Sequence, residues 1–484
     1  MKASTWRQHH KWTGIVLCVF LLMFCLSGIV LNHRSWFADV NVSRSVLPPW
    51  YRFNDWNGGL LRGTLPLGGD TVLLYGGGGV WLARSDGSNV EDYNQGLPTG
   101  ADRRAMRAVA LAGDGRLFAV SQFGLFARTP RAEQWAEIKV PTDGEERLSD
   151  LVLRGDTLVV VGRSHLYVGA LGPVGEAPAM ERAEVTVPPG LDRRVTLFKT
   201  IWRLHSGELF GMAGKLVMDA VALVLIFLSI TGMMCWLMPK SAVRTGKRGR
   251  RVLRWTLRWH NQIGRATILL TLLAGITGWC LRPPLMVPLV LAKTKPPVRE
   301  NAWHDKLRAL RYDARQGDWL LFTSEGFFSL PDLDGLPTKI DNAPPVSVMG
   351  INVWERSGEG FWLCGSFSGM TVWDRATGAL FDYFTGVPLW GEHASPFGAL
   401  AVSGYTADIG NYPLVIDYGQ GTDAFPQPAS MGCLPMSLWN VALEVHTGRA
   451  YFGNSATYFW IFLAGALVVW CLWSGWRMRA HRPS

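Results

Sequence analysis

The sequence predicts a membrane protein in which a four-helix transmembrane bundle, made of two repeated helix pairs, is joined to an exported all-β region. Three observations lead to this fold class. Four long stretches of the 484-residue chain carry no charged residue. Histidines near the ends of these stretches recur at matching positions in the two halves. The two long segments between the stretches are rich in turn glycines and β-forming residues.

The four charge-free stretches are the expected membrane spans. They are residues 12–32, 220–239, 266–281 and 451–476. Three of them reach the roughly 20 residues that a helix needs to cross hydrocarbon, and the shorter third stretch has apolar flanks. The first stretch follows basic residues as the core of a signal peptide would, but no small-residue cleavage site comes after it, so we expect it to be retained.

The spans divide the chain into seven predicted parts. These are the N-terminus with the first span (1–32), a first exported β region (33–204), the second span (205–239), a basic cytoplasmic loop (240–259), the third span (260–282), a second exported β region (283–445), and the fourth span with the tail (446–484).

The basic residues predict the orientation of the chain. Residues 240–258 contain eight Lys or Arg and no acidic residue, and both termini are also basic. Cytoplasmic segments of membrane proteins are enriched in Lys and Arg. We therefore expect a multi-pass protein of the bacterial inner membrane, with cytoplasmic termini and periplasmic loops. Topology then accounts for much of the net charge of +10, so the expected partner is the lipid bilayer and not nucleic acid.

Both exported segments contain a repeated β pattern: a Gly/Asp turn, an apolar run, a short turn and a second apolar run. Copies lie near Asp70, Asp114, Asp156, Asp318 and Glu359, with a weaker sixth copy at 399–418. Spacings of 44, 42 and 41 residues within the segments match the roughly 40–45 residues of a propeller blade. Three copies per segment favour one β-propeller built from both, because three blades close poorly alone. The alternative is two separate small β or α+β domains.

The seven cysteines are too scattered to indicate a disulfide framework. Five lie in or beside the spans, where cysteine packs as a small apolar residue. Only Cys364 and Cys433 lie in exported segments, where an oxidising compartment would allow them to pair. The sequence has no C-x-x-C-H motif, so covalent attachment of a haem is not expected.

Histidines and glycines mark the spans in the same way in both halves. The repeated positions are His10, Gly14 and Gly28 in the first span and His260, Gly264 and Gly278 in the third, with His205 and His446 ahead of the second and fourth spans. Eighteen residues separate the histidine from the distant glycine, which is about five helical turns, so the two share one helix face. A small residue on that face leaves room for a bulky group or for a close helix approach.

Two histidines at each membrane face predict two bis-histidine b-type haems, because haem iron takes its axial imidazoles in pairs from facing helices. We expect His10 with His260 at the cytoplasmic face and His205 with His446 at the outer face. These four residues are the expected metal ligands. His33, about 35 Å along the first helix from His10, stays an alternative outer ligand. The competing interpretation is that the histidines are interfacial residues without a cofactor.

Charged residues near the outer face extend this predicted site. Arg34, Arg203 and Arg449 flank the outer histidines and can bind haem propionates as bidentate donors. Lys215 and Asp219 are four residues apart at the outer end of the second span, which permits an ion pair that stabilises the helix or relays protons.

The histidine motifs resemble those of the PepSY-associated transmembrane family. In that family a span opens with His-x-x-x-Gly and closes with Ser/Thr-Gly, and the exported segment that follows ends in L-H-[ST]-G-x-x-x-G. In this chain LHSGELFG at 204–211 fits the second motif. VHTGRAYFG at 445–453 is similar but has one extra residue before its last glycine. The resemblance covers the spans and their flanks. It implies a di-haem inner-membrane reductase that acts on ferric siderophores, although the long exported segments differ from the compact PepSY α/β domain.

The leading hypothesis is therefore transmembrane electron transfer through two b-type haems. The donor would be a quinol or a cytoplasmic donor, and the acceptor a periplasmic ferric siderophore or other metal chelate, which makes the protein an oxidoreductase. The alternative is a membrane-anchored binding or scaffold propeller without redox activity. The 23 tryptophans suit either, because tryptophan is common in membrane belts and on binding faces.

The predicted topology is testable by cysteine labelling in intact cells. An impermeant thiol reagent added from outside should label cysteines introduced at Asp114 and Glu359. It should not label one introduced at Ser241, because the basic segment is expected in the cytoplasm. The reverse pattern would invert the topology and overturn the assignment of the inner and outer histidines.

Overall fold

The computed structural model describes residues 3–144, 146–244, 246–297, 301–389 and 400–478. The chain divides into two compact units. A helical unit contains residues 1–37, 192–300 and 438–484, and a β unit contains residues 38–191 and 301–437. Each unit therefore combines segments that are far apart in the sequence.

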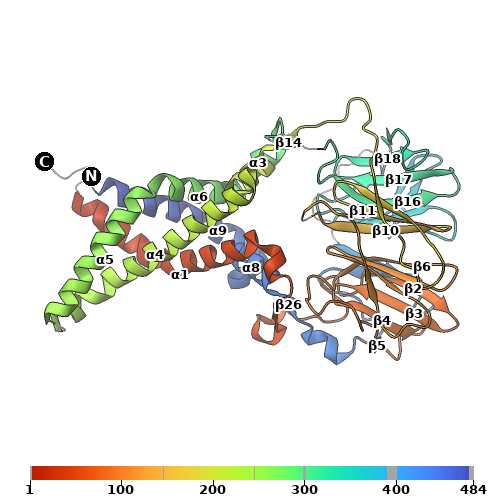
Figure 1. Cartoon of the computed structure of the whole chain (residues 1–484), viewed down its shortest axis with the longest axis horizontal. Helices are drawn as coiled ribbons and strands as arrows, with labels where there is room; N and C mark the ends of the chain where they lie inside the picture. Colours follow the sequence, from red (N-terminus) through yellow and green to blue (C-terminus); the bar gives the residue numbers. More distant parts are fainter. Residues whose placement is uncertain (1–2, 145, 245, 298–300, 390–399, 479–484) are drawn as a thin grey trace. The chain divides into compact units, whose positions relative to one another are not determined.

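The helical unit consists mainly of long helices from both halves of the chain (Figure 1). Its α-helices are α1 (Ala3–Asn32), α2 (Arg34–Phe37), α3 (Leu197–Ser206), α4 (Gly211–Arg244), α5 (Gly246–Ala266), α6 (Ile268–Cys280), α7 (Met286–Leu291), α8 (Leu438–His446) and α9 (Arg449–Arg477). A 3-10 turn, η3 (Glu208–Phe210), precedes α4, and two short strands, β14 (Val195–Thr196) and β15 (Lys293–Thr294), pair with each other. Helix α1 packs against α4, α8 and α9, and α6 packs against α3 and α9.

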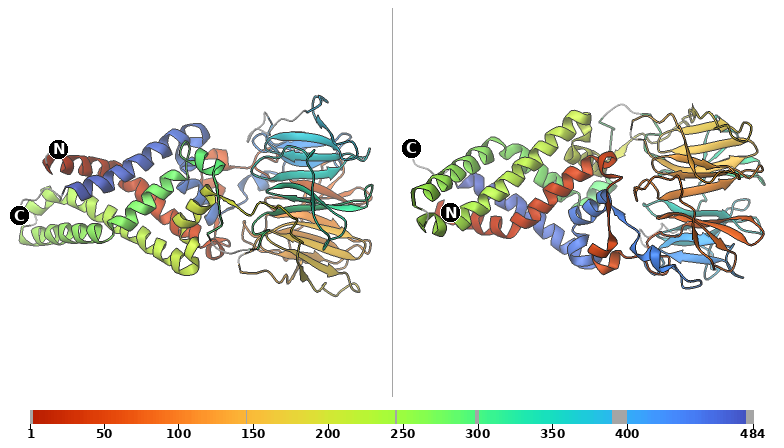
Figure 2. Two further views of the ribbon diagram at one scale, coloured as in Figure 1. Left: turned by 90° about the horizontal axis from the view of Figure 1, so that it is seen from above. Right: turned by 60° about the horizontal axis from the view of Figure 1, so that its bottom comes forward.

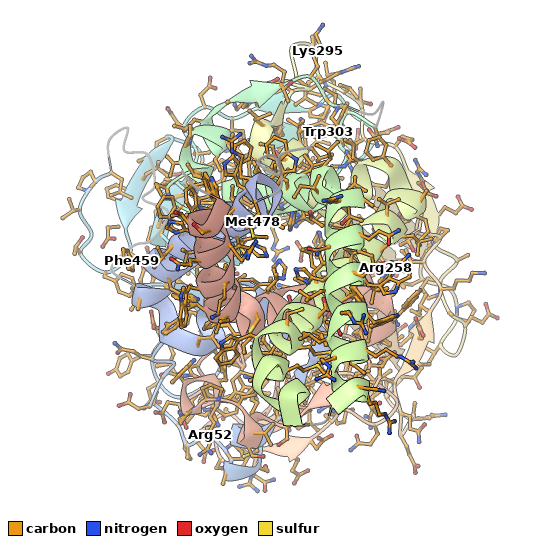
Figure 3. The ribbon with its side chains drawn as sticks, turned by 90° about the vertical axis from the view of Figure 1, so that its left-hand side faces the viewer. Arg52, Arg258, Lys295, Trp303, Phe459 and Met478 are labelled. Atoms are coloured by element: carbon orange, nitrogen blue, oxygen red, sulfur yellow. The ribbon has the colours of Figure 1, made fainter. Side chains whose placement is uncertain are left out.

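Three of the described helices are long and apolar enough to cross a membrane, within Ser4–Asn32, Glu208–Met238 and Ala456–Arg477. A fourth span results if α5 and α6 count as one, although their axes differ by 68°. Large apolar side chains point outward from these helices: Leu269 is 80% exposed and Phe459 75%. Figure 3 shows Phe459 at the periphery of the helices. Such surface is suited to lipid, and the protein is a membrane protein with the bilayer as its partner.

The structure differs from the sequence prediction in the basic segment. Residues 240–259 were predicted as a loop, but α4 continues to Arg244 and α5 begins at Gly246, so the segment is largely helical. The physical reason is that arginine and lysine are good helix formers, and the segment contains no proline after Pro239. His260 consequently lies inside α5, six residues before this helix ends at Ala266, and not at the start of a straight span.

The β unit contains, within the described residues, five four-stranded antiparallel sheets and a sixth of two strands. The strands from the first exported segment are β2 (Gly63–Gly68), β3 (Thr71–Gly76), β4 (Gly79–Arg84), β5 (Glu91–Asp92), β6 (Met106–Leu111), β7 (Leu117–Ser121), β8 (Leu125–Arg128), β9 (Ala136–Ile138), β10 (Leu148–Arg154), β11 (Thr157–Gly162), β12 (Leu166–Ala170) and β13 (Glu181–Ala183). Those from the second are β16 (Leu307–Asp313), β17 (Asp318–Thr323), β18 (Gly326–Leu330), β19 (Thr338–Lys339), β20 (Ile351–Arg356), β21 (Trp362–Ser366), β22 (Gly369–Asp374), β23 (Ala379–Asp382), β24 (Val402–Thr406) and β25 (Leu414–Asp417).

Each sheet pairs its strands in chain order, as the repeated turn and apolar pattern predicts, and Figure 2 shows the sheets as separate layers within the unit. The second strand of each four-stranded sheet is almost entirely buried, as in β7 and β21. Several hairpins contain a glycine with positive φ, a conformation that would be strained in a residue with a side chain. One example is Gly79 (φ 124°), the first residue of β4. Two further strands, β1 (Asn41–Val42) and β26 (Met436–Ser437), pair the two ends of the unit.

Apolar cores lie between successive sheets. Leu73, Met106 and Phe126 join the first sheet to the second, and Val159, Leu310 and Phe328 join the third to the fourth across the two exported segments. Trp56, Leu74 and Ile416 pack between the sixth sheet and the first. Among the described residues the hydrogen-bonded strands form separate sheets and close neither a barrel nor a propeller.

Cys364 and Cys433, for which the sequence allowed a disulfide, are free in the structure. Cys364 is buried in β21, whereas Cys433 is exposed in the 3-10 turn η4 (Ala429–Cys433). Two shorter 3-10 turns, η1 (Arg44–Val46) and η2 (Pro49–Tyr51), follow β1.

Candidate functional site

The four histidines predicted as ligands lie in two pairs within the helical unit. The ring centroids of His10 and His260 are 6.2 Å apart, and those of His205 and His446 are 6.3 Å apart. The ring planes within the pairs meet at 61° and 51°. Each pair thus combines one histidine from each half of the chain, in the combination that the repeat predicts.

Short helices that the sequence analysis placed in the β regions carry the outer pair. His205 is the penultimate residue of α3, and His446 is the last residue of α8. Gly207 and Gly448 then adopt left-handed conformations, with φ of 80° and 82°, that reverse the chain toward the next span. A side chain in this region would be strained, which explains the glycine of both H-[ST]-G motifs.

The extra residue in the second outer motif leaves its geometry unchanged. Gly211 has φ 60° and ψ −145°, and Gly453 has φ 64° and ψ −166°. Both are in a region of the backbone map that is essentially restricted to glycine. In each motif a glycine therefore makes the same sharp entry into the span, although it lies six residues after His205 and seven after His446.

Hydrogen bonds to Nδ1 orient the outer histidines. Nδ1 of His446 lies 3.0 Å from both the Ser27 hydroxyl and the Phe24 carbonyl oxygen. Nδ1 of His205 lies 3.1 Å from the hydroxyl of Thr277. Each outer histidine is thereby tied to a span from the other half of the chain.

The inner histidines are held in the same way. Nδ1 of His260 lies 2.9 Å from the Thr231 hydroxyl on α4. Nδ1 of His10 lies 2.9 Å from the carbonyl oxygen of Cys471 on α9, which also accepts a hydrogen bond of 2.9 Å from Ser474.

These contacts assign the tautomer of the four rings. A carbonyl oxygen only accepts, so Nδ1 of His10 and His446 must carry the proton. The hydroxyls of Thr231 and Thr277 donate to the carbonyls of Phe227 and Leu273, both at 2.7 Å, and so offer their oxygen to the ring as an acceptor. With Nδ1 protonated, Nε2 is the nitrogen with a lone pair for a metal.

A glycine from the other half of the chain packs against each of these histidines. A Cβ at Gly28 or Gly232 would lie 3.4 Å from Cε1 of His446 or His260, and a Cβ at Gly278 or Gly475 only 2.8 Å from Cε1 of His205 or His10. The sequence analysis noted Gly28 and Gly278 but missed Gly232 and Gly475. The signal was present, because a Ser/Thr-Gly dipeptide occurs at 27–28, 231–232, 277–278 and 474–475, inside all four predicted spans.

His33 is hydrogen-bonded to a residue outside the outer pair. Its Nε2 is 2.6 Å from a carboxylate oxygen of Asp219, which also accepts a hydrogen bond of 3.2 Å from Asn32. Its ring stacks on Trp36 with centroids 4.2 Å apart. His33 therefore joins the end of α1 to α4, and Asp219, which the sequence analysis paired with Lys215, is its hydrogen-bond partner.

The arginines predicted to bind haem propionates make different contacts in the structure. The guanidinium of Arg34 lies 4.0 Å from the ring centre of Trp439, and Nε of Arg449 is 2.9 Å from a carboxylate oxygen of Glu444. Arg203 is two residues before His205 on α3. Arg282, which was not noted from the sequence, follows α6 and lies four residues after Gly278, the glycine that packs against His205. Figure 3 looks onto the opposite end, where α5 carries Arg258.

Among the described residues, the histidines of the β unit belong to no metal-binding group. His165 lies in a polar network of the β unit, and His393 is outside the described residues. In the part of the chain that the structure describes, no group of three or more His, Cys, Asp or Glu side chains is placed to hold a metal ion. Any metal bound by the paired histidines would therefore need most of its ligands from a cofactor.

Comparisons with known proteins agree with the helical part of this description. Residues 2–238 match the model of the PepSY-associated TM region. No curated protein matches the chain. Among solved structures, it is similar to the extracellular domains of a one component system and of hybrid two component systems from B. thetaiotaomicron, BT4673 and BT3049, with 8–10% identity and TM-scores of 0.33–0.34. These alignments cover 76–78% of this chain and only 38–39% of those chains.

The glycine contacts give a steric prediction. Gly278→Ala and Gly475→Ala should each lower the thermal stability of the purified protein by about 1–3 kcal/mol, because the new methyl group displaces an imidazole from a packed position. Gly14→Ala is the matched control, since its Cβ would lie 3.8 Å from the sulfur of Cys471 and meets no histidine. Equal melting temperatures for all three variants would contradict the packing described above.

Proposed function

We propose that the chain transfers electrons across the membrane through two b-type haems, one held by His10 and His260 and the other by His205 and His446. A quinol or a cytoplasmic donor supplies the electrons, and a periplasmic ferric siderophore or other metal chelate accepts them. In this proposal the membrane is the bacterial inner membrane, with both termini in the cytoplasm. When bound, haem supplies an iron that alternates between ferric and ferrous states.

The spacing of the rings is the observation that carries this proposal. An imidazole nitrogen binds a transition metal at about 2.0 Å and lies roughly 1.2 Å from its ring centre, so two histidines that shared one metal would hold their ring centroids up to about 6.4 Å apart. The observed separations are 6.2 and 6.3 Å. Two protein ligands per site suit haem, because the porphyrin supplies the remaining four.

The chain's own residues orient the ligands. Each Nδ1–H donates to a hydroxyl or carbonyl oxygen, which fixes the tautomer, prevents ring rotation and increases the basicity of Nε2. These hydrogen bonds join helices from different halves of the chain, so the ligand pairs are preorganised by the fold. At 27–28, 231–232 and 277–278 the Ser/Thr-Gly dipeptide does both tasks, since one residue accepts the hydrogen bond and the next makes room for the ring. At 474–475 only the glycine contacts the ring, because the acceptor for His10 is the Cys471 carbonyl oxygen.

The position of the pairs along α1 fits electron transfer across a bilayer. His10 belongs to the inner pair, and Gly28, eighteen residues later, contacts His446 of the outer pair. Eighteen helical residues span about 27 Å, close to the thickness of the hydrocarbon core. One pair would then lie near each membrane face.

Arginines at the outer end would bind the carboxylates of the outer cofactor. Arg282 is one candidate, because it lies four residues after Gly278, which packs against His205. Arg34 and Arg203 are secondary candidates, whereas Arg449 already has Glu444 as a carboxylate partner. Arginine suits this task because its planar fork binds a carboxylate through two parallel hydrogen bonds.

We infer that the β unit presents the acceptor and that its sheets are blades of one propeller. The support is that the first strands of neighbouring sheets contact one another, as in β2 with β6, β6 with β10, β10 with β16, β20 with β24 and β24 with β2. The hydrogen bond of 2.9 Å from Arg311 on β16 to the carbonyl oxygen of Trp354 on β20 joins the remaining neighbours. The alternative function, a membrane-anchored scaffold without redox activity, gives no reason for four histidines paired at the spacing of a metal.

Haem content and ligand substitution test the proposal. Purified full-length protein should contain two b-type haems per chain by pyridine haemochrome analysis. His10→Ala and His260→Ala should remove the same haem, and His205→Ala and His446→Ala the other, because each haem loses an axial imidazole. A colourless protein from haem-replete cells would rule out electron transfer through haem.

His33→Ala is the control for ligand assignment. Because His33 is hydrogen-bonded to Asp219, its replacement should leave both haem spectra in place and affect only the stability of the contact between α1 and α4. Loss of the outer haem in His33→Ala, together with its retention in His205→Ala or His446→Ala, would assign His33 as an outer ligand.

A further inference from the structure

One face of α5 carries a stripe of basic residues. Its members are Lys247, Arg250, Arg251, Arg254 and Arg258, and all of them are exposed. At about 100° per residue they fall within an arc of roughly 100°, and from Lys247 to Arg258 they extend over about 16 Å of helix. The helix thus concentrates the charge of the basic segment on one side.

The opposite face of α5 packs against α4. Gly249 and Thr256 are buried and lie about 180–200° around the helix from Lys247. His260 is on this same side, where its Nδ1 contacts the Thr231 hydroxyl of α4. The stripe therefore faces away from α4, and one helix diameter, about 10–12 Å, separates it from the side that carries His260.

Helices α4 and α5 form an antiparallel hairpin that continues beyond the inner histidine pair. Thr231 is 13 residues before α4 ends at Arg244, and His260 is 14 residues after α5 begins at Gly246. Because Thr231 and His260 are in contact, the two arms of the hairpin have nearly equal length. Its tip lies about 20 Å beyond the inner pair.

Tryptophans indicate how much of the stripe leaves the membrane. Trp255 and Trp259 on α5 are exposed, with ring centroids 6.4 Å apart. Exposed tryptophan is typical of the membrane–water interface. Lys247 is eight residues, about 12 Å, further along the helix than Trp255, whereas the headgroup layer is about 5–8 Å thick on each side. The tip of the stripe, which is Lys247 with Arg250 and Arg251 on the next turn, therefore reaches the aqueous phase.

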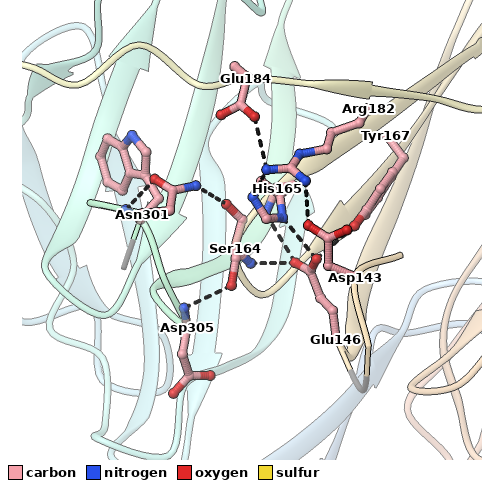
Figure 4. Close-up of polar contacts among 10 residues, drawn as sticks. Asp143, Glu146, Ser164, His165, Tyr167, Arg182, Glu184, Asn301 and Asp305 are labelled. Carbon is pink, nitrogen blue, oxygen red and sulfur yellow. Dashed lines mark hydrogen bonds and ion pairs between the residues drawn. The ribbon is translucent and has the colours of Figure 1, made fainter. Parts of the chain in front are cut away.

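The sequence around the stripe contains no acidic residue. Residues 1–38, 220–299 and 445–484 include no Asp or Glu. Asp219, the acid of α4, is 25 residues or about 37 Å before this helix ends at Arg244. The β unit differs, because Arg182 there forms ion pairs with Asp143 and Glu184 (Figure 4). The charge of the stripe is therefore complementary to an acidic surface on another molecule.

We propose that the stripe on α5 is the docking surface for an acidic, soluble one-electron carrier of the cytoplasm. This inference rests on the proposed electron transfer, in which this end of the helices is cytoplasmic. It names the donor as a protein with a negatively charged face rather than a quinol. The carrier docks one helix diameter from His260, loses one electron, and the ferric inner haem gains it; no bond forms or breaks. Complementary charge orients such an encounter and raises its rate constant.

Anionic lipid is the other polyanion at this membrane face. Arg254 and Arg258 flank Trp255 and Trp259 at headgroup depth, where they are suited to lipid phosphates. The tip of the stripe is held on a helix and lies past the headgroups, which favours a soluble partner there. The experiment therefore removes charge at the tip.

Stopped-flow reduction of the full-length, haem-containing protein by a reduced acidic [2Fe–2S] ferredoxin tests this surface. The protein is placed in nanodiscs of phosphatidylcholine, which has no net charge. The second-order rate constant for haem reduction should fall at least fivefold in Arg250→Gln/Arg251→Gln. Raising the salt concentration should slow the wild type more than this variant. Arg250→Lys/Arg251→Lys keeps the charge and should retain the wild-type rate constant within twofold.

Arg7→Gln/Arg477→Gln is the matched control. It removes the same charge from the ends of α1 and α9, which meet where the Arg477 guanidinium lies 6.0 Å from the ring centre of Trp6. Its rate constant should stay within twofold of wild type. Equal losses in the two glutamine variants, no loss in Arg250→Gln/Arg251→Gln, or no reduction by ferredoxin would overturn the assignment. A loss seen only in nanodiscs with anionic lipid would assign the stripe to lipid instead.

Haem content and reduction by dithionite, measured in the same samples, separate these outcomes from failure of the proposed function. Protein with two haems that dithionite reduces, but whose reduction by ferredoxin does not depend on the stripe, refutes only the docking surface. Protein without haem refutes the electron transfer itself.

Discussion

The helical unit depends on one repeated interaction, in which an imidazole N–H donates to an oxygen on a span from the other half of the chain. His10, His205, His260 and His446 all make it, and a glycine beside each ring lets the helices approach. Inside a membrane an unsatisfied polar group is costly, so a buried histidine has to find such a partner. The same bond that joins the two halves also selects Nδ1 as the protonated nitrogen, which links the fold directly to metal binding.

Backbone conformation at glycines determines where the outer histidines lie relative to the long helices. The outer histidines are on the short helices α3 and α8, and a left-handed glycine after each turns the chain back toward the bilayer. At the other end of the helical unit, His260 lies on the arginine-rich helix α5, before the bend to α6. From there its Nδ1 is hydrogen-bonded to Thr231. Local backbone conformation therefore positions the rings, and hydrogen bonds between the two halves of the chain orient them.

The sequence predicted the features that occur in both copies of the repeated helix pair. It predicted less well the contacts that depend on how distant segments pack together. The pairing of His10 with His260 followed from matching offsets, because two copies of one module can be compared position by position. The basic segment was misjudged as a loop, since its charge was interpreted as topology while arginine also favours helix. The partners of His33 and Arg449 were not predictable, because Asp219 and Glu444 are brought to them by tertiary contacts. In the β unit, turn spacing indicated the sheets, but not that β10 and β16 would pack together across the two segments.

The central claim is that two imidazoles hold each of two haems, and electron paramagnetic resonance of the oxidised full-length protein tests it most directly. Ligation by two imidazoles fills both axial positions, so the account predicts low-spin ferric signals from two haems and no high-spin signal. The signal of one haem should be lost in His260→Ala and that of the other in His446→Ala. A high-spin ferric signal in the intact protein, or a single low-spin haem per chain, would contradict the account.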